Sequence, residues 1–232
     1  MATLPSTDPA ARDAVPELCR IVRLGTVPYR EAWDLQVEIA DRVRRGLTPD
    51  TLLLLEHPHT YTRGRLSPDT HLLLDQSAIV ETDRGGLITY HGPGQLVAYP
   101  IVRLRGRGGP HWYVRTLEQV ISNSLVEFGL ATSTVDGLTG VWTADGRRKL
   151  AAIGVKIAGG VAYHGFAINV RADLSMFDAI IPCGIADRGV TSVAAELSGR
   201  AELLTVDTIA DAVARHFCTA FGFKPTPDET GQ

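Results

Sequence analysis

The chain has 232 residues, of which 44% are hydrophobic, and it carries 23 Lys and Arg against 26 Asp and Glu. This composition is too apolar for a disordered or collagen-like protein, and the length suits one sizeable domain. The formal net charge is −3. Nucleic-acid-binding domains usually carry a basic excess, so we expect no nucleic-acid partner.

The sequence predicts a cytoplasmic protein without a membrane span. No apolar run approaches the roughly 18 residues that a membrane helix needs, so we expect no membrane partner. Residues 1–16 lack the basic start and apolar stretch of a signal peptide. The three cysteines, Cys19, Cys183 and Cys218, form neither a disulfide framework nor a CxxC motif, so each is either core filler or a reagent.

The first half of the chain alternates a helix with strands. Residues 1–16 hold three prolines and no periodicity, which predicts a flexible tail. Apolar residues three and four apart predict a helix over 32–43, and the continuous apolar run 51–55 predicts a strand covered on both faces. Residues 79–82 and 87–90 flank the turn signal 83–86, which predicts a hairpin.

The second half predicts two more helices and a second set of paired strands. Its expected elements are a helix over 114–128, strands over 141–143 and 150–157 around an Asp145–Gly146 turn, a strand over 161–170, and a helix over 206–221 between Thr205 and Gly222. Hairpins with few long helices indicate one α+β domain, with a mixed, largely antiparallel sheet flanked by helices. We expect this domain over 17–222, with a flexible C-terminal tail over 223–232.

Cys183 is the cysteine with a chemical context. Pro182 and Gly184 on either side predict a turn, where a thiol can be exposed as a nucleophile or buried as a small apolar residue. Local sequence leaves both interpretations open. Cys19 in a strand-like run and Cys218 in the last helix fit core or surface filler.

A nucleophilic thiol needs a partner that favours the thiolate, either a histidine or a nearby cation. Lys149 precedes an apolar strand, where it is either a solvated flank or an ammonium that lowers a thiol pKa. His91 and His164 each precede a glycine at a strand end. His57 and His59 have metal-ligand spacing, but Pro58 lies between them and no further ligand cluster follows, so we expect no metal.

Residues 84–95 are rich in glycine, which permits unusual backbone conformations and close approach of a ligand. They match neither a Walker loop nor a dinucleotide fingerprint. They form either one wall of a slot for an elongated substrate or two tight turns. Five arginines, Arg103, Arg105, Arg107, Arg147 and Arg148, are candidates for a basic patch toward an acidic partner.

Together these segments resemble the lipoyl(octanoyl) transferase family. Four blocks occur in the family's order, at 84–100, 149–155, 164–170 and 182–185, and the match extends from about Leu24 to Phe221. The resemblance implies a fold like the catalytic domain of biotin and lipoate protein ligases. It also implies octanoyl transfer from octanoyl-acyl carrier protein to a lysine of a lipoyl domain, through a cysteine thioester and without a cofactor. The acceptors would be the E2 subunits of 2-oxoacid dehydrogenases and the glycine-cleavage H protein.

The resemblance also assigns roles to individual residues. Cys183 would be the nucleophile and Lys149 the partner that lowers its pKa and handles protons. The residues implied to line the acyl slot are Arg84, Gly85, Gly86, Leu87, Ile88, Thr89, Tyr90, His91, Ala152, Ile153, Gly154, Gly165, Phe166 and Ala167. The alternatives are an ATP-dependent lipoate or biotin ligase on the same fold, a noncatalytic acyl-carrier- or lipoyl-domain-binding protein, and a cysteine hydrolase. Cys183 argues against the ligase, which would not need covalent cysteine chemistry, and an intact Cys183 and Lys149 argue against the noncatalytic protein. No His/Asn or His/Asp pair supports the hydrolase.

Overall fold

The computed structural model describes residues 17–67, 79–180, 188–198 and 204–226. Its elements, in order, are β1 (Glu17–Thr26), α1 (Tyr29–Arg44), β2 (Asp50–Glu56), β3 (Thr60–Arg63), β4 (Ile79–Glu81), β5 (Thr89–His91), β6 (Gln95–Arg103), α2 (Pro110–Val126), β7 (Thr132–Val135), β8 (Leu138–Thr143), β9 (Arg148–Ala158), β10 (Val161–Asn169), the 3₁₀-helix η4 (Leu174–Ala179), β11 (Gly189–Val190), α3 (Val193–Glu196), α4 (Val206–Phe221) and β12 (Phe223–Pro225). Among these elements, no helix is both long and apolar enough to cross a membrane.

A mixed sheet forms the centre of the domain. Its strand order is β12-β1-β2-β6-β10-β9-β8-β7, with β11 added beside β9. The pairs β1–β12, β1–β2 and β9–β11 are parallel, and the pairs from β2 through β6, β10, β9 and β8 to β7 are antiparallel. A small second sheet, β4-β3-β5, lies beside it. The α+β prediction is therefore confirmed.

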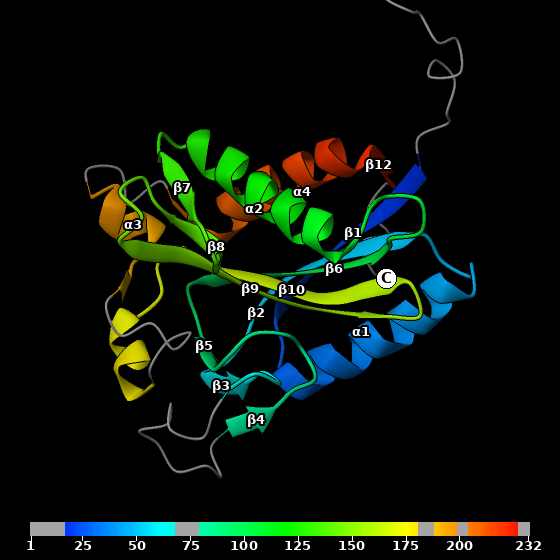
Figure 1. Cartoon of the computed structure of the whole chain (residues 1–232), viewed down its shortest axis with the longest axis horizontal. Helices are drawn as coiled ribbons and strands as arrows, with labels where there is room; N and C mark the ends of the chain where they lie inside the picture. Colours follow the sequence, from blue (N-terminus) through cyan, green and yellow to red (C-terminus); the bar gives the residue numbers. More distant parts are fainter. Residues whose placement is uncertain (1–16, 68–78, 181–187, 199–203, 227–232) are drawn as a thin grey trace, which may run out of the picture.

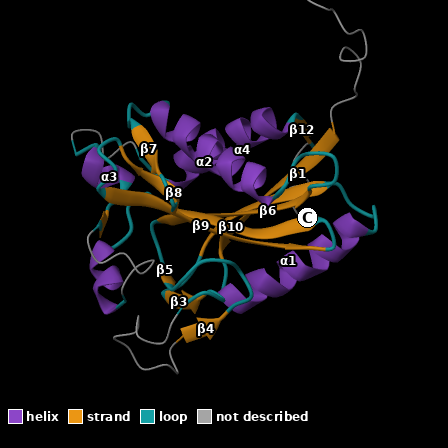
Figure 2. Ribbon diagram, in the orientation of Figure 1, coloured by secondary structure: helices purple, strands orange, loops and turns teal. Residues whose placement is uncertain are grey.

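Helices cover both faces of the main sheet (Figures 1 and 2). Leu52 and Leu54 of β2 belong to the cluster under α2 and α4, whereas Leu53 and Leu55 belong to the cluster under α1. Successive side chains of a strand point to opposite faces, so a continuous apolar run fits a strand buried on both sides. The interpretation of 51–55 from sequence is confirmed.

The capping residues determine where the helices begin and end. Thr205 and Thr208 form a reciprocal capping box at the start of α4, and Gly222 ends the helix in the left-handed conformation (φ 69°). The structure confirms these expected boundaries. In α2 the helix begins earlier than the apolar period indicates, because Pro110 occupies the first turn, where its missing N–H leaves no bond unmade.

The predicted hairpin at 83–86 is wrong. Strands β4 and β5 do not pair with each other; each pairs with β3, β4 in parallel and β5 antiparallel. The connection instead crosses to the main sheet, where the N–H of Gly85 donates to the carbonyl of Val155 (2.9 Å). Glycines in this segment serve that close approach.

The C-terminal boundary also differs from the expectation. Phe223 begins β12, is 6% exposed, and pairs in register with Glu17 of β1. The N–H of Thr226 then donates to the carbonyl of Cys19 (2.8 Å). Residues 223–225 are therefore part of the sheet rather than of a tail, and Phe223 packs against Phe217 and Phe221 of α4.

Leu117 tests the packing of α2 on the sheet. Its side chain is fully buried in the larger core cluster. We expect Leu117→Ala to lower the free energy of unfolding by about 2–5 kcal/mol, since the cavity is only partly refilled. Urea denaturation measures this. Val126→Ala on the same helix, where Val126 is 58% exposed, is the control, and an equal loss in both variants would contradict the packing described.

Candidate active site

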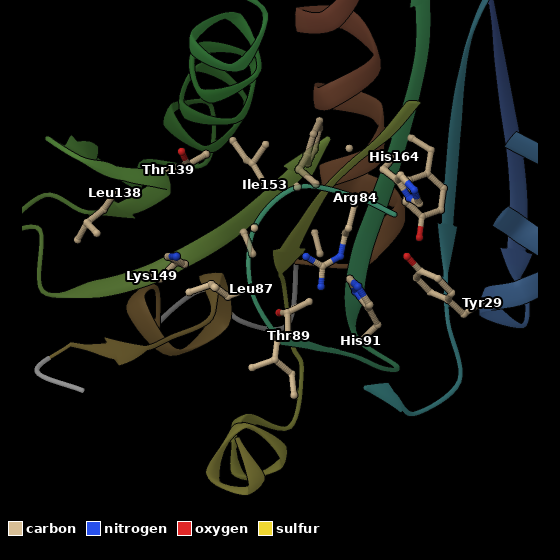
Figure 3. Close-up of a pocket in the computed structure, with 18 of the residues that line it drawn as sticks. Tyr29, Arg84, Leu87, Thr89, His91, Leu138, Thr139, Lys149, Ile153 and His164 are labelled. Atoms are coloured by element: carbon tan, nitrogen blue, oxygen red, sulfur yellow. The ribbon is translucent and has the colours of Figure 1, made fainter. Parts of the chain in front are cut away.

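A cavity of about 280 Å³ opens beside the central strands. Its walls come from β9, β10, the segment before β5, the β7–β8 turn, α1 and β6. Figure 3 shows Lys149 and Leu87 at one end, Tyr29 and His164 at the other, and Ile153 and Arg84 between them. The cavity is therefore elongated, with a cation at one end and rings at the other.

The segment before β5 forms one wall of the cavity because Gly154 of β9 has no side chain that would keep this segment away. A Cβ atom at Gly154 would lie 2.9 Å from the carbonyl oxygen of Gly85 and 3.1 Å from Cδ of Arg84. Arg84 is 7% exposed, and its Nη2 donates to the carbonyl (3.0 Å) and hydroxyl (2.9 Å) of Thr62. Buried guanidinium groups need such acceptors, so this contact holds the wall in place.

Lys149 lies at the start of β9, 6% exposed, with Nζ 4.7 Å from the centre of the Trp142 ring. Its strand neighbour is β11, where Val190 pairs with Lys149 and the N–H of Thr191 donates to the Lys149 carbonyl (3.0 Å). The ammonium is thus held at the end of the cavity by strand pairing and by an aromatic face.

The opposite end is a buried cluster of rings. His57 donates through Nδ1 to the Val27 carbonyl (2.6 Å), so its Nε2 accepts from the Tyr99 hydroxyl (2.7 Å). Burial lowers the pKa of His57 to about 4 and lowers that of His91 well below its usual range. Tyr29 stacks on His91 with ring centres 5.7 Å apart. Burial also raises the pKa of Tyr29. This end of the cavity is therefore polar, but its imidazole and phenol rings carry no charge.

Asp83 holds the imidazole ring of His164, which also belongs to this cluster. Its carboxylate accepts from Nε2 of His164 (2.7 Å) and from Nζ of Lys156 (2.5 Å). Burial raises the pKa of Asp83, but these hydrogen bonds outweigh it and hold the pKa below its usual range. Burial lowers the pKa of His164, which outweighs the opposing effect of Asp83. His164 is therefore neutral, with its proton on Nε2.

His164 has an unusual backbone at the position of β10 that lies opposite a proline of β6. The β6–β10 register runs from Ala162 opposite Val102 to Phe166 opposite Ala98, which sets His164 opposite Pro100. Proline cannot donate to the ladder. His164 takes φ 55° there, and its N–H donates to Oε1 of Gln36 (2.9 Å) from α1. This left-handed conformation directs the imidazole toward Asp83.

The structure gathers most of the residues predicted for the acyl slot around this one cavity. Those lining it are Arg84, Gly86, Leu87, Ile88, Thr89, His91, Lys149, Ala152, Ile153, Gly154, Gly165, Phe166 and Ala167. Tyr90 points away from the cavity, since neighbours on β5 alternate, and its hydroxyl bonds Nδ1 of His59 (2.7 Å). Gly85 faces the backbone of β9. Cys183 lies outside the described residues.

Sequence reasoning missed several lining residues. Tyr29 and Tyr99 lie in a helix and a strand whose patterns indicate only core, and Leu138 and Thr139 follow a turn that carried no chemical signal. His164 carried a signal, the glycine that follows it, but no role. His57 and His59, whose spacing resembles that of metal ligands, bond different tyrosines: His57 bonds Tyr99 and His59 bonds Tyr90.

The five candidate arginines do not form one patch. Arg147 and Arg148 lie at the start of β9, whereas Arg103 pairs with Val161, beside the end of β9. Arg103 bonds Asp50 (3.3 Å) and Arg107 contacts Glu17. The eleven residues of β9 separate the two groups by roughly 30 Å at about 3.3 Å per residue.

Comparison with known proteins identifies the family. Residues 28–218 match the family described as the lipoyl protein ligase A/B catalytic domain. The octanoyltransferase of Mycolicibacterium smegmatis is 50% identical over 203 residues, which cover 85% of this chain and 87% of that one. This chain belongs to the octanoyltransferases. The octanoyltransferase of Roseiflexus sp. is 45% identical over 214 residues, 88% of each chain. The expectation of an acyltransferase is thereby confirmed.

A solved structure supports the fold of this octanoyltransferase-family chain. Lipoate-protein ligase A bound with ATP superposes with a TM-score of 0.70 at 18% identity, covering 90% of this chain and 87% of that one. Identity this low is informative about the fold alone. The predicted likeness to lipoate ligases is confirmed at that level.

The buried histidines predict an acid-sensitive fold. His57, His91 and His164 are neutral when folded, whereas exposed histidines titrate near pH 6.5. Unfolding therefore takes up protons below about pH 6.5, so the stability is complete above that pH and falls as the pH drops. Below about pH 6.5 the loss should approach about 1.4 kcal/mol per pH unit for His57 and for His91, measured by urea denaturation between about pH 7 and pH 5.

A non-titrating substitution tests the assignment. His57→Gln keeps a donor and an acceptor but removes one proton uptake, so its plot of stability against pH should be shallower than that of the wild type. Exposed His111, changed to Ala, is the control and should leave the slope unchanged. An unchanged slope in His57→Gln would contradict a neutral, buried His57.

Proposed function

We propose that this chain transfers an octanoyl group, in the cytoplasm, from octanoyl-acyl carrier protein to a lysine of a lipoyl domain, through a thioester on Cys183. The acceptors are the lipoyl domains of 2-oxoacid dehydrogenases and the glycine-cleavage H protein. The observation that carries the proposal is an elongated cavity with apolar walls that ends at Lys149, in a chain related to octanoyltransferases. An alkyl chain needs burial and few hydrogen bonds, which Leu87, Ile153 and Phe166 provide.

The described residues on either side of the 181–187 segment support the role of Cys183. Ile180 and Val190 both pack in the cluster that contains Ile88, a residue of the cavity wall. Val190 is also the strand partner of Lys149. The chain therefore leaves and re-enters the described structure beside the lysine end of the cavity.

The transfer takes two steps with Lys149 as the proton carrier. The Cys183 thiolate attacks the donor's carbonyl carbon, the bond to the carrier's sulfur breaks, and the Lys149 ammonium protonates the leaving sulfur. The neutral amine of the acceptor lysine then attacks the Cys183 thioester. An amide forms, Cys183 leaves as a thiolate, and the amine's proton returns to Lys149.

The polar end of the cavity fits the far end of a short acyl chain. Its histidines are neutral and its hydroxyls are protonated, so an alkyl terminus meets no charged ring there. The buried cation between the two ends, Arg84, is held by backbone and hydroxyl oxygens. Binding of the acyl group by these residues is a proposal that rests on cavity shape and polarity.

The ligase alternative is less well supported. A thioester donor is already activated, so the transfer needs no ATP, whereas a ligase first makes an adenylate. Relatives at 45–50% identity are octanoyltransferases. The lipoate ligase that superposes on this chain shares 18% identity, which supports a common fold only.

Intact-mass analysis tests the thioester. We expect incubation with octanoyl-carrier protein, without ATP, to add one octanoyl group that hydroxylamine removes. Cys183→Ala should abolish the adduct, because the acceptor sulfur is lost. Cys19→Ala and Cys218→Ala should keep it, since burial raises the pKa of both thiols and places them in the core. An adduct that persists in Cys183→Ala would move the nucleophile elsewhere.

The pH dependence of alkylation tests Lys149. A nearby ammonium favours the thiolate, so iodoacetamide should label Cys183 with an apparent pKa below the value of about 8.5 for a free thiol. Lys149→Ala should raise that apparent pKa. Lys149→Arg should keep it low but slow acyl transfer at least about tenfold, because guanidinium does not exchange its proton.

Peptide mass spectrometry reports labelling at Cys183 separately from Cys19 and Cys218. A matched control is Lys156→Ala, which removes the other lysine of β9, located away from the Lys149 end and bonded to Asp83. If the alkylation profile of Lys149→Ala equals that of the wild type, Lys149 is not the partner of the thiolate.

A further inference from the structure

A second groove, of about 740 Å³, lies at the β8–β9 turn and is not part of the acyl cavity. It is lined by Asp145, Arg147, Arg148, Arg188 and Gly189. Three guanidinium groups therefore share one open depression with one carboxylate. Guanidinium groups bind phosphate through paired, charge-assisted hydrogen bonds, so this composition favours an anion.

Internal contacts leave much of this positive charge available. Within the part of the chain that the structure describes, the guanidinium of Arg147 makes no hydrogen bond or ion pair. Arg148 is bound to Glu196 (3.0 Å), but its side chain is 49% exposed. Arg188 donates to the carbonyl of Gly146 and retains further N–H groups. Asp145 is engaged by the Thr143 hydroxyl (2.5 Å) and the Arg147 N–H (3.1 Å).

The groove lies next to the lysine end of the acyl cavity, because a cation of each site lies near the indole ring of Trp142. Arg188 has its Cζ 5.6 Å from the centre of the Trp142 ring, and Lys149 has its Nζ 4.7 Å from the same centre. The two cations are therefore separated by no more than the sum of these distances. Strand β11 connects them as well, because Gly189 pairs with Arg148 and Val190 with Lys149.

Resting on the function proposed above, we infer that this arginine groove binds the phosphodiester of the donor's prosthetic arm. The thioester of a carrier protein lies at the end of a long, flexible arm, and a phosphodiester joins that arm to the protein. The donor must bring its thioester to Lys149 while its phosphate remains outside the apolar cavity. The groove is a cationic surface next to that end, and the other group of candidate arginines is at the far end of β9.

Three octanoyl donors separate the possible sources of the anion. Octanoyl-carrier protein has the arm, the phosphodiester and an acidic protein surface. Octanoyl-4′-phosphopantetheine has the arm and a phosphate, and octanoyl-pantetheine has the arm alone. Steady-state transfer to a lipoyl domain is measured with each donor for wild type and for Arg147→Ala/Arg188→Ala. The control is Arg105→Ala, an exposed arginine near the opposite end of the sheet.

We expect the double variant to raise KM about tenfold or more for both phosphate-bearing donors, since each lost bond involves a charged group. Its kcat should be largely retained, and added salt should weaken wild-type binding toward the level of the variant. For octanoyl-pantetheine, wild type and double variant should have the same KM. Arg105→Ala should match the wild type with all three donors.

Two results would overturn the inference. One is a KM change confined to octanoyl-carrier protein, which would assign the groove to the carrier's protein surface instead. The other is an equal change for octanoyl-pantetheine, which would indicate damage to the acyl site. Absence of transfer from every donor by the wild-type protein would contradict the proposed function itself, so the two failures are distinguishable.

Discussion

The left-handed backbone of His164, opposite Pro100 in the register of β10 and β6, is the constraint on which the cavity depends. The ladder between the two strands is interrupted at this position, and the N–H of His164 and the carbonyl of Pro100 both bond side chains from opposite faces of the sheet. Gln36 of α1 accepts the N–H of His164 (2.9 Å), and the Tyr113 hydroxyl of α2 donates to the carbonyl of Pro100 (3.3 Å). Both helices are therefore fixed to the same point of the sheet. The left-handed backbone at His164 then holds the ring at the cavity end, where Asp83 receives it.

A second hydrogen-bond chain connects the two ends of the cavity. His91 bonds Gln95 (3.3 Å), Gln95 donates to Asn169 (2.9 Å), and Asn169 donates to the carbonyl of Thr191 (2.9 Å). The N–H of Thr191 in turn reaches the carbonyl of Lys149. All these side chains are buried, and each hydrogen bond fixes the orientation of the next side chain in the series. The polar end of the cavity and the backbone of its lysine end thus form one rigid unit.

Local patterns in the sequence were enough to predict the three long helices and the strands β2, β9 and β10, but not the central strand β6. The period of 206–221 with Thr205 and Gly222 gave both ends of α4, and the unbroken run 51–55 gave a strand buried on both faces. The segment 83–86 misled, because its glycines have the composition of a hairpin turn but serve the approach to β9. Phe223 misled in the same way, since a three-residue strand carries no periodic signal.

The residues of the candidate site also fall into a group that was predicted from local sequence and a group that was not. Lys149 and the glycine-rich wall each lie in a short continuous motif and were predicted, with the acyl role carried by resemblance to a family. Tyr29 and Tyr99 were not predicted, because their place in the cavity depends on how α1 and β6 pack, and nothing in their neighbours differs from ordinary core. Arg188 joins the arginine groove only because β11 pairs with β9, a contact between segments some forty residues apart.

The missing side chain at Gly154 has a consequence for how this family can diversify. The N–H of Gly85 bonds the carbonyl of Val155 (2.9 Å), and a Cβ atom at Gly154 would meet the carbonyl oxygen of Gly85, so backbone contact sets the spacing between β9 and the Arg84 segment. Substitutions at the lining positions can therefore lengthen, shorten or polarise the cavity while its width stays constant. The width of the cavity is therefore fixed by the backbone, whereas its length can change through substitutions of the lining side chains.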